Sequence, residues 1–121
     1  MQNHKKQLSL VVPIYNEEEI IKELYQKIKV VLNEYFPDHE IIIIDDGSTD
    51  RSLSILKELT TQDEQLIVTQ LTRNFGQSAA IMAGILEADK EIIVTMDGDL
   101  QNDPQDIPLL VNKLAEGFFP T

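Results

Sequence analysis

Four short apolar runs rich in isoleucine and valine punctuate this sequence, and they constrain its fold more than any other feature. The runs lie at residues 8–12, 40–44, 66–71 and 91–96. None alternates apolar and polar residues for long, which is typical of strands covered on both faces. Between the runs, apolar residues recur at the three- and four-residue spacing of a helix face. The sequence therefore predicts the order β-α-β-α-β-α-β-α.

Strands that alternate with helices form right-handed crossovers in a mostly parallel sheet. We therefore expect a Rossmann-like, three-layer α/β/α fold made by a single domain over residues 1–121. Asn16 is placed to cap the first helix, whose apolar face runs from Ile20 to Tyr35. In the third helix the small residues Ala80 and Gly84 would allow close packing against the sheet.

Ligands of such sheets bind beyond the carboxyl ends of the strands. Polar or acidic segments follow three of the predicted strands, at residues 13–17, 45–48 and 97–99. A parallel sheet would gather all three at one rim. The sequence thus predicts an acidic ligand site at that rim.

Asp97 and Asp99 follow the fourth strand, and their spacing lets both carboxylates point the same way from an extended segment. Oxygen ligands of this kind suit Mg²⁺ or Mn²⁺. Such an ion would bridge a diphosphate and neutralise charge on a leaving group. Gly98 removes side-chain bulk where a ligand must approach closely. The alternative is an acidic turn leading into the helix near Pro104, but the strand-end position opposite a second acidic pair favours the cation site.

The other rim residues have alternative interpretations. Asp45 and Asp46 could accept hydrogen bonds from a nucleobase or ribose. The alternative is a turn in which one of residues 48–50 caps the second helix. Both hold if residues 48–50 cap the helix while Asp46 faces the ligand. Tyr15 could lie against a base or be a half-buried aromatic. Arg73 could contact a phosphate or form a salt bridge in this acidic neighbourhood.

The overall composition narrows the classes of partner. The chain carries 21 acidic and 10 basic residues, a net charge of −11, which argues against both nucleic acid and an anionic membrane surface as partners. It has no cysteine, so disulfides and thiolate zinc sites are excluded. No apolar run is long enough for a signal peptide or a membrane span, and we expect a cytoplasmic protein. We assign no role to His4 or His39, and we expect the acidic pair at residues 63–64 to be solvated.

Four motifs together resemble the family 2 glycosyltransferases of the GT-A fold: VVPIYNEEE, IIIIDDGSTD, RNFGQSAAIMAGI and TMDGDLQNDPQDIP. The DLQNDP stretch is similar to the branch of dolichyl-phosphate mannose synthases and bacterial polyprenyl-phosphate glycosyltransferases. The resemblance runs from about Leu8 to Phe118. It implies inverting transfer of a hexose from a UDP- or GDP-linked donor, with Mg²⁺ or Mn²⁺, to a polyprenyl phosphate or a growing cell-envelope glycan. The parent protein would then act at the cytoplasmic face of the membrane.

The resemblance also implies roles for individual residues. The metal would be bound by the D-x-D residues Asp97 and Asp99, completed by Gln101. The donor would be bound by Pro13, Tyr15, Glu17, Asp45, Asp46, Gln77, Asp97 and Gly98.

This sequence departs from the family pattern at its end. After LAEGF the family continues into another strand and an acceptor-binding half that carries the general base, whereas this sequence stops at FFPT. We therefore expect a donor-binding domain with no general base of its own and little activity alone. Its exposed sheet edges could pair in a homodimer.

Two other classes compete with this interpretation. One is a non-catalytic nucleotide-sugar-binding module that acts with a partner chain. The other is a signalling receiver domain, which needs an acidic pair after the first strand. Here Pro13-Ile14-Tyr15-Asn16 occupies that place, so the receiver class is disfavoured.

Overall fold

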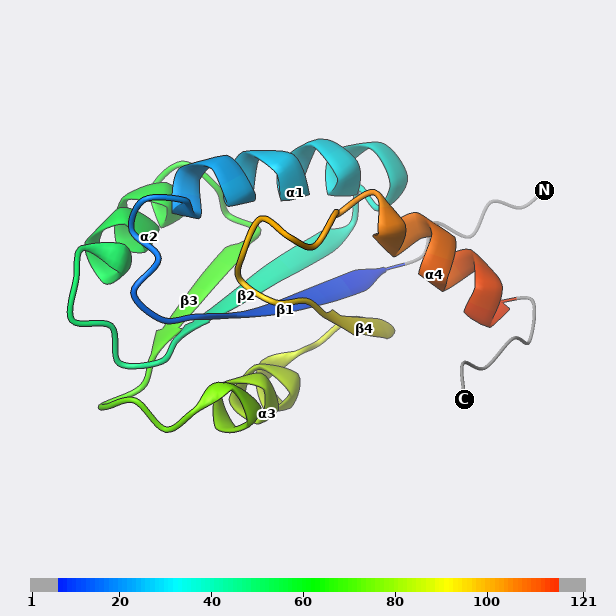
Figure 1. The fold of residues 1–121 in the computed structure, drawn as a ribbon. Coiled ribbons are helices and arrows are strands. Elements are labelled where there is room, and N and C mark those ends of the chain that lie inside the picture. The colour runs from blue at the N-terminus through cyan, green and yellow to red at the C-terminus, as the bar shows by residue number, and fades with distance from the viewer. Residues whose placement is uncertain (1–6, 116–121) are drawn as a thin grey trace.

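The computed structural model describes residues 7–115. Within them four strands alternate with four helices, as predicted, and the strands form one sheet between two helical layers (Figure 1). In chain order the elements are β1 (Leu8–Ile14), α1 (Ile21–Tyr35), β2 (His39–Asp45), α2 (Ser52–Thr60), β3 (Leu66–Gln70), α3 (Gln77–Glu87), β4 (Ile92–Thr95) and α4 (Asp106–Ala115).

The sheet is entirely parallel, with the strand order β3-β2-β1-β4. The chain steps outward from β1 to β2 and β3, and then returns across the sheet to place β4 on the other side of β1. Val11 of β1 pairs with Ile42 of β2 on one side and Thr95 of β4 on the other. The order therefore reverses between β1 and β4, and such reversals open a crevice at the carboxyl ends of parallel strands.

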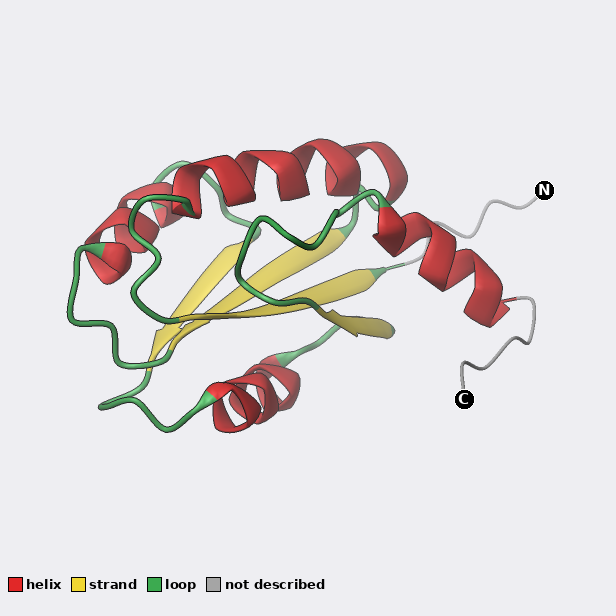
Figure 2. Cartoon of the chain, in the orientation of Figure 1, coloured by secondary structure: helices red, strands yellow, loops and turns green. Residues whose placement is uncertain are grey.

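The two faces of the sheet are covered unequally: α1, α2 and α4 lie on one face and α3 lies on the other (Figure 2). In β1, Leu10 and Val12 pack with the α1 side, whereas Val11 packs with Ala80 of α3. This alternation within an uninterrupted apolar run is the packing of a strand buried on both faces. The three-layer α/β/α prediction is thus confirmed.

The predicted cap of α1 is wrong. The helix is preceded by Ile20, which makes no side-chain capping hydrogen bond. Asn16 has a left-handed backbone (φ 52°), and its side-chain oxygen accepts the backbone N–H groups of Thr49 and Asp50. The left-handed turn directs Asn16 toward the β2–α2 loop, so its amide links two loops instead of starting a helix.

The predicted apolar face of α1 is confirmed at its centre and differs at its two ends. Ile21 and Leu32 are buried, whereas Tyr35 is 49% exposed. Leu24, Ile28 and Val31 were predicted to lie on this face and are buried.

His39 and Asp63 lie in a polar network at the amino end of the sheet, which corrects their predicted surroundings. His39 is the buried first residue of β2; its Nδ1 lies 2.7 Å from the Phe36 carbonyl and its Nε2 lies 2.9 Å from Lys29 Nζ. Asp63 accepts a hydrogen bond from the Tyr25 hydroxyl and pairs with Lys29 at 3.1 Å. Asp63 is therefore a partly buried structural anchor and not a solvated charge.

Within residues 7–115 no helix has both the length and the apolar character needed to cross a bilayer. The sheet edges are β3 and β4, and Ile93 on β4 is 43% exposed. Pairing of either edge with a second chain stays a prediction.

Candidate functional site

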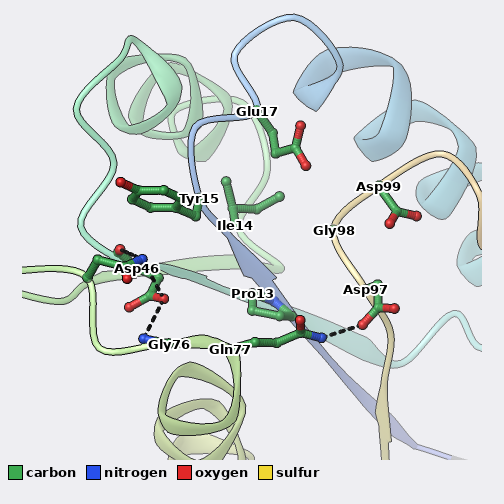
Figure 3. A pocket seen from close by; sticks show the side chains of 11 residues that line it. Pro13, Ile14, Tyr15, Glu17, Asp46, Gly76, Gln77, Asp97, Gly98 and Asp99 are labelled. Atoms are coloured by element: carbon green, nitrogen blue, oxygen red, sulfur yellow. Dashed lines mark hydrogen bonds between the residues drawn. The ribbon is translucent and has the colours of Figure 1, made fainter.

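An open pocket lies at the carboxyl ends of β1 and β4, where the sheet order reverses (Figure 3). The loops after all four strands, the last two residues of β1 and the first residue of α3 contribute to it. Its lining residues are Pro13, Ile14, Tyr15, Glu17, Asp46, Asn74, Gly76, Gln77, Asp97, Gly98 and Asp99.

Hydrogen bonds between loops hold the β1 side of the pocket. The backbone N–H of Glu17 donates to Ser52 Oγ, and that of Asn16 donates to Ser48 Oγ, each at 2.9 Å. The Asp46 N–H donates to the Ile14 carbonyl at 2.8 Å. Hydrogen bonds therefore hold the segments that follow β1 and β2 against each other.

Gly98 allows the segment after β4 to lie directly against the end of β1. A Cβ at this position would meet the Pro13 carbonyl oxygen at 2.3 Å and the Ile14 side chain at 2.6 Å. No side chain fits into that space. The close approach places Asp97 and Asp99 in the pocket wall opposite Glu17 (Figure 3).

The pocket is strongly acidic. Burial and then the charges of Asp99 and Asp50 raise the pKa of Glu17 above its ordinary value. Asp50 behaves oppositely: burial alone would raise its pKa, but hydrogen bonds led by those from Ser52 lower it. The lining residues include Glu17, Asp46, Asp97 and Asp99 and no lysine, arginine or histidine. An anionic ligand would need a cation to enter this pocket.

The two aspartates that close β2 lie in different surroundings. Asp46 lines the pocket and accepts hydrogen bonds from Phe75 N–H at 2.8 Å and Gly76 N–H at 3.0 Å. Asp45 is fully buried and does not line it; its Oδ2 accepts a 3.3 Å bond from Ser48 N–H. The structure thus separates a pair that the sequence presents as equivalent.

The expected capping of α2 by residues 48–50 is confirmed in part. Asp50 Oδ1 accepts the Ser52 N–H at 2.8 Å. The residue directly before the helix is Arg51, and it makes no side-chain capping bond. One member of the 48–50 group therefore serves the helix, and Asp46 remains in the pocket.

Of three other residues singled out in the sequence, only Tyr15 lines the pocket; Gln101 and Arg73 do not. Gln101 is exposed and outside the pocket lining, and its backbone N–H donates to Asp99 Oδ1 at 3.0 Å. Tyr15 is 45% exposed and forms part of the pocket wall. The Arg73 guanidinium lies 4.5 Å from the centroid of the Phe75 ring, and no carboxylate of the described residues forms an ion pair with it.

Three lining residues were not among the sequence candidates: Ile14, Asn74 and Gly76. Asn74 and Gly76 belong to the loop after β3, which is the far edge strand of the sheet. They reach the pocket because α3 crosses back over β2 and β1. The NFG sequence signals a loop, but only the crossover shows where that loop lies.

Asp97 and Asp99, the predicted metal ligands, both line the pocket. Residues 7–115 contain no group of three or more histidine, aspartate or glutamate side chains close enough to form a complete metal site. Mg²⁺ and related ions often bind through one or two carboxylates and take their other ligands from substrate phosphates and water. Two carboxylates beside an open acidic pocket fit that mode of binding.

Solved structures with the same architecture are GT-A glycosyltransferases. S. aureus TarS (residues 1–349) matches with a TM-score of 0.73 and 25% identity, over 91% of this chain and 32% of that one. The mannosyltransferase PcManGT from Pyrobaculum calidifontis, in complex with GDP-Man and Mn²⁺, matches with a TM-score of 0.69 and 24% identity, over 78% and 28%. The fold is therefore the GT-A fold.

The sequence profile of Glycosyl transferase family 2 matches residues 9–119, and the chain belongs to this family. Similar proteins include the undecaprenyl-phosphate 4-deoxy-4-formamido-L-arabinose transferases of Pectobacterium carotovorum subsp. carotovorum (strain PC1) and Proteus mirabilis (strain HI4320). The first is 42% identical over 114 residues, 93% of this chain and 35% of the relative. The second is 41% identical over 112 residues, 92% and 34%. The chain thus spans about a third of the length of these relatives, and the predicted resemblance is confirmed.

Proposed function

We propose that this chain is the donor-binding part of an inverting glycosyltransferase that uses a nucleotide-diphosphate sugar and a divalent metal ion. The observation that carries the proposal is the pocket at the β1–β4 reversal, whose four carboxylates face an opening without any basic side chain. A diphosphate is repelled by such a wall unless a cation lies between them. Family membership supports sugar transfer as the reaction class.

The pocket residues form two groups, one after β4 and one after β1 and β2. Asp97 and Asp99 would hold Mg²⁺ or Mn²⁺, which when bound neutralises the diphosphate leaving group. On the other side, Tyr15 presents an exposed ring on which a base can stack, and Asp46 keeps acceptor capacity on its carboxylate. The two groups adjoin where the Gly98 backbone lies against the Pro13 carbonyl.

We propose that the acceptor site lies in the part of the relatives that this chain does not span. Those relatives are named as undecaprenyl-phosphate transferases, and we propose a polyprenyl phosphate as the acceptor of the full protein. The general base would come from that additional length, so we expect the 121-residue chain to bind donor and to transfer little sugar.

Calorimetric titration of the chain with UDP and GDP, each with and without Mn²⁺, tests this function. We expect one nucleotide to bind only when Mn²⁺ is present. Asp97→Asn together with Asp99→Asn should weaken that binding at least about a hundredfold, because each charged ligand contributes on the order of 1.5–3 kcal/mol. Both residues lie in a loop at the rim, so circular dichroism should show an unchanged fold.

Two results would contradict the proposal. Equal nucleotide binding by the double mutant and the parent would show that these carboxylates hold no metal. Absence of binding under all four conditions would remove the donor site from this chain. A chain that binds nucleotide, and whose full-length protein transfers no sugar, would instead be a binding module that acts with a partner.

A further inference from the structure

We propose that Gln77 is a positioning residue that orients the Asp97 carboxylate for metal binding; this inference rests on the proposed function. The Gln77 side-chain amide donates from Nε2 to Asp97 Oδ1 at 2.5 Å, although the two residues are 20 positions apart (Figure 3). Gln77 is the first residue of α3, and Asp97 follows β4. A helix on one face of the sheet therefore contacts the loop that would carry the metal.

The orientation of the Asp97 carboxylate depends on this contact. Among the described residues, Gln77 supplies the only hydrogen bond to the exposed Asp97 side chain. Asp99 is different: its Oδ1 accepts the Gln101 N–H at 3.0 Å and the Asn102 amide at 3.3 Å, both from its own loop. One carboxylate of the pair is thus oriented locally, and the other is oriented by α3.

Gln77 is itself held in place. The residue before it, Gly76, donates its N–H to Asp46 Oδ2 at 3.0 Å, and the Asn74 amide donates to the same oxygen at 3.1 Å. Asp46 is only 3% exposed, so this carboxylate is a fixed anchor. The start of α3 is therefore tied to the end of β2, and the Gln77 amide projects from a defined point.

This arrangement leaves Asp97 able to bind a cation. One donated hydrogen bond to Oδ1 leaves Oδ2 and the second lone pair of Oδ1 free. A neutral amide donor also adds no charge that would compete with the metal for the carboxylate. Residues that orient metal ligands in this way typically contribute 10–100-fold to metal affinity. We therefore expect loss of the Gln77 amide to weaken metal binding about tenfold.

The test is the affinity of the metal-free chain for Mn²⁺ alone, followed by the electron paramagnetic resonance signal of free Mn²⁺. Gln77→Met keeps the side-chain length and removes the donor, and Gln77→Asn keeps the amide but shortens its reach. Both should raise the Kd for Mn²⁺ about tenfold. Ser78→Ala is the matched control, because Ser78 is the next residue of the helix and is exposed.

Thermal unfolding without metal separates positioning from stability. Gln77 is exposed, so both variants should unfold within a degree or two of the parent, an effect on the order of 0.5 kcal/mol. If the parent binds Mn²⁺ and Gln77→Met binds it equally well, the positioning role is wrong while the proposed function stands. If the parent binds Mn²⁺ neither alone nor together with UDP or GDP, both the positioning role and the proposed function fail.

Discussion

Glu17 is the residue on which the charge of the acidic pocket has its clearest effect. Its carboxylate faces Asp99 across the opening (Figure 3), and burial together with the charges of Asp99 and Asp50 raises its pKa. A raised carboxyl pKa means that the ionised side chain destabilises the folded state at neutral pH. A cation in the pocket would offset the repulsion between these carboxylates. The charge that destabilises the metal-free chain is therefore the same charge that would bind the proposed metal ion.

Glu17→Gln should therefore stabilise the metal-free chain at neutral pH. The gain is present above the raised pKa, where Glu17 is ionised in both states, and disappears as the pH falls below the ordinary value of about 4.3. Thermal unfolding of the parent and the variant at low ionic strength measures the gain near pH 7 and its disappearance below pH 4. A Glu17→Gln variant that unfolds at or below the parent's temperature at neutral pH would show that the pocket charges do not oppose folding.

At the scale of elements, α3 is the piece that connects the parts of the site. Within residues 7–115 it is the only helix on its face of the sheet, where it packs on β1 and β2, and its first residue lines the pocket. Gly84 sets how closely it lies: a Cβ there would be 2.3 Å from Val11 Cγ1 and 3.3 Å from Ile44 Cγ1. The small residues that the sequence places in this helix are thus explained by contact with two central strands.

Gly84→Ala should destabilise the chain although alanine is the better helix former. Overpacking against a buried, β-branched neighbour costs about 1–3 kcal/mol, and helix propensity returns up to about 1 kcal/mol. We expect a net loss of about 1–2 kcal/mol in urea unfolding. Val11→Ala should cost less in the Gly84→Ala background than in the parent, because it removes the clashing methyl groups. Additive losses would contradict the close contact.

For the whole molecule, the two ends of the sheet have different electrostatic roles. The carboxyl end carries the uncompensated acidic pocket. The amino end carries the network of Lys29, His39, Asp63 and Tyr25, where charges are paired. Within it, burial lowers the pKa of His39; the Lys29 ammonium lowers it further, while the Phe36 carbonyl and the charges of Asp63 and Asp38 oppose the change.

The lowered pKa makes stability depend on pH below neutrality. In the unfolded chain His39 takes up a proton as the pH falls through about 6.5, whereas the folded chain resists until its lower pKa is reached. The free energy of unfolding should therefore decrease as the pH falls below about 6.5. Urea unfolding across this range should show a flatter profile for His39→Asn than for the parent.

His4→Asn is the control for that experiment, since His4 is the only other histidine in the sequence. It should keep the parent's slope. Parallel profiles for the parent and His39→Asn would mean that His39 is not the group responsible.

The sequence alone determined the order of elements, the parallel sheet, the family and most of the pocket wall. These follow from local information: periodicity identifies strands and helices, alternation requires crossovers, and crossovers bring the carboxyl ends of strands together. Pro13, Glu17, Asp97 and Asp99 were therefore predicted and do line one pocket.

Only the tertiary structure decided which side chains meet. The return of β4 to the free side of β1 placed Asp97 within reach of Gln77, and the crossing of α3 brought Asn74 and Gly76 from the far edge of the sheet. The same three-dimensional arrangement buried Asp45 beside a pocket-lining Asp46. These outcomes depend on strand order and helix rotation, which are set by long-range packing, and no local pattern of residues encodes them.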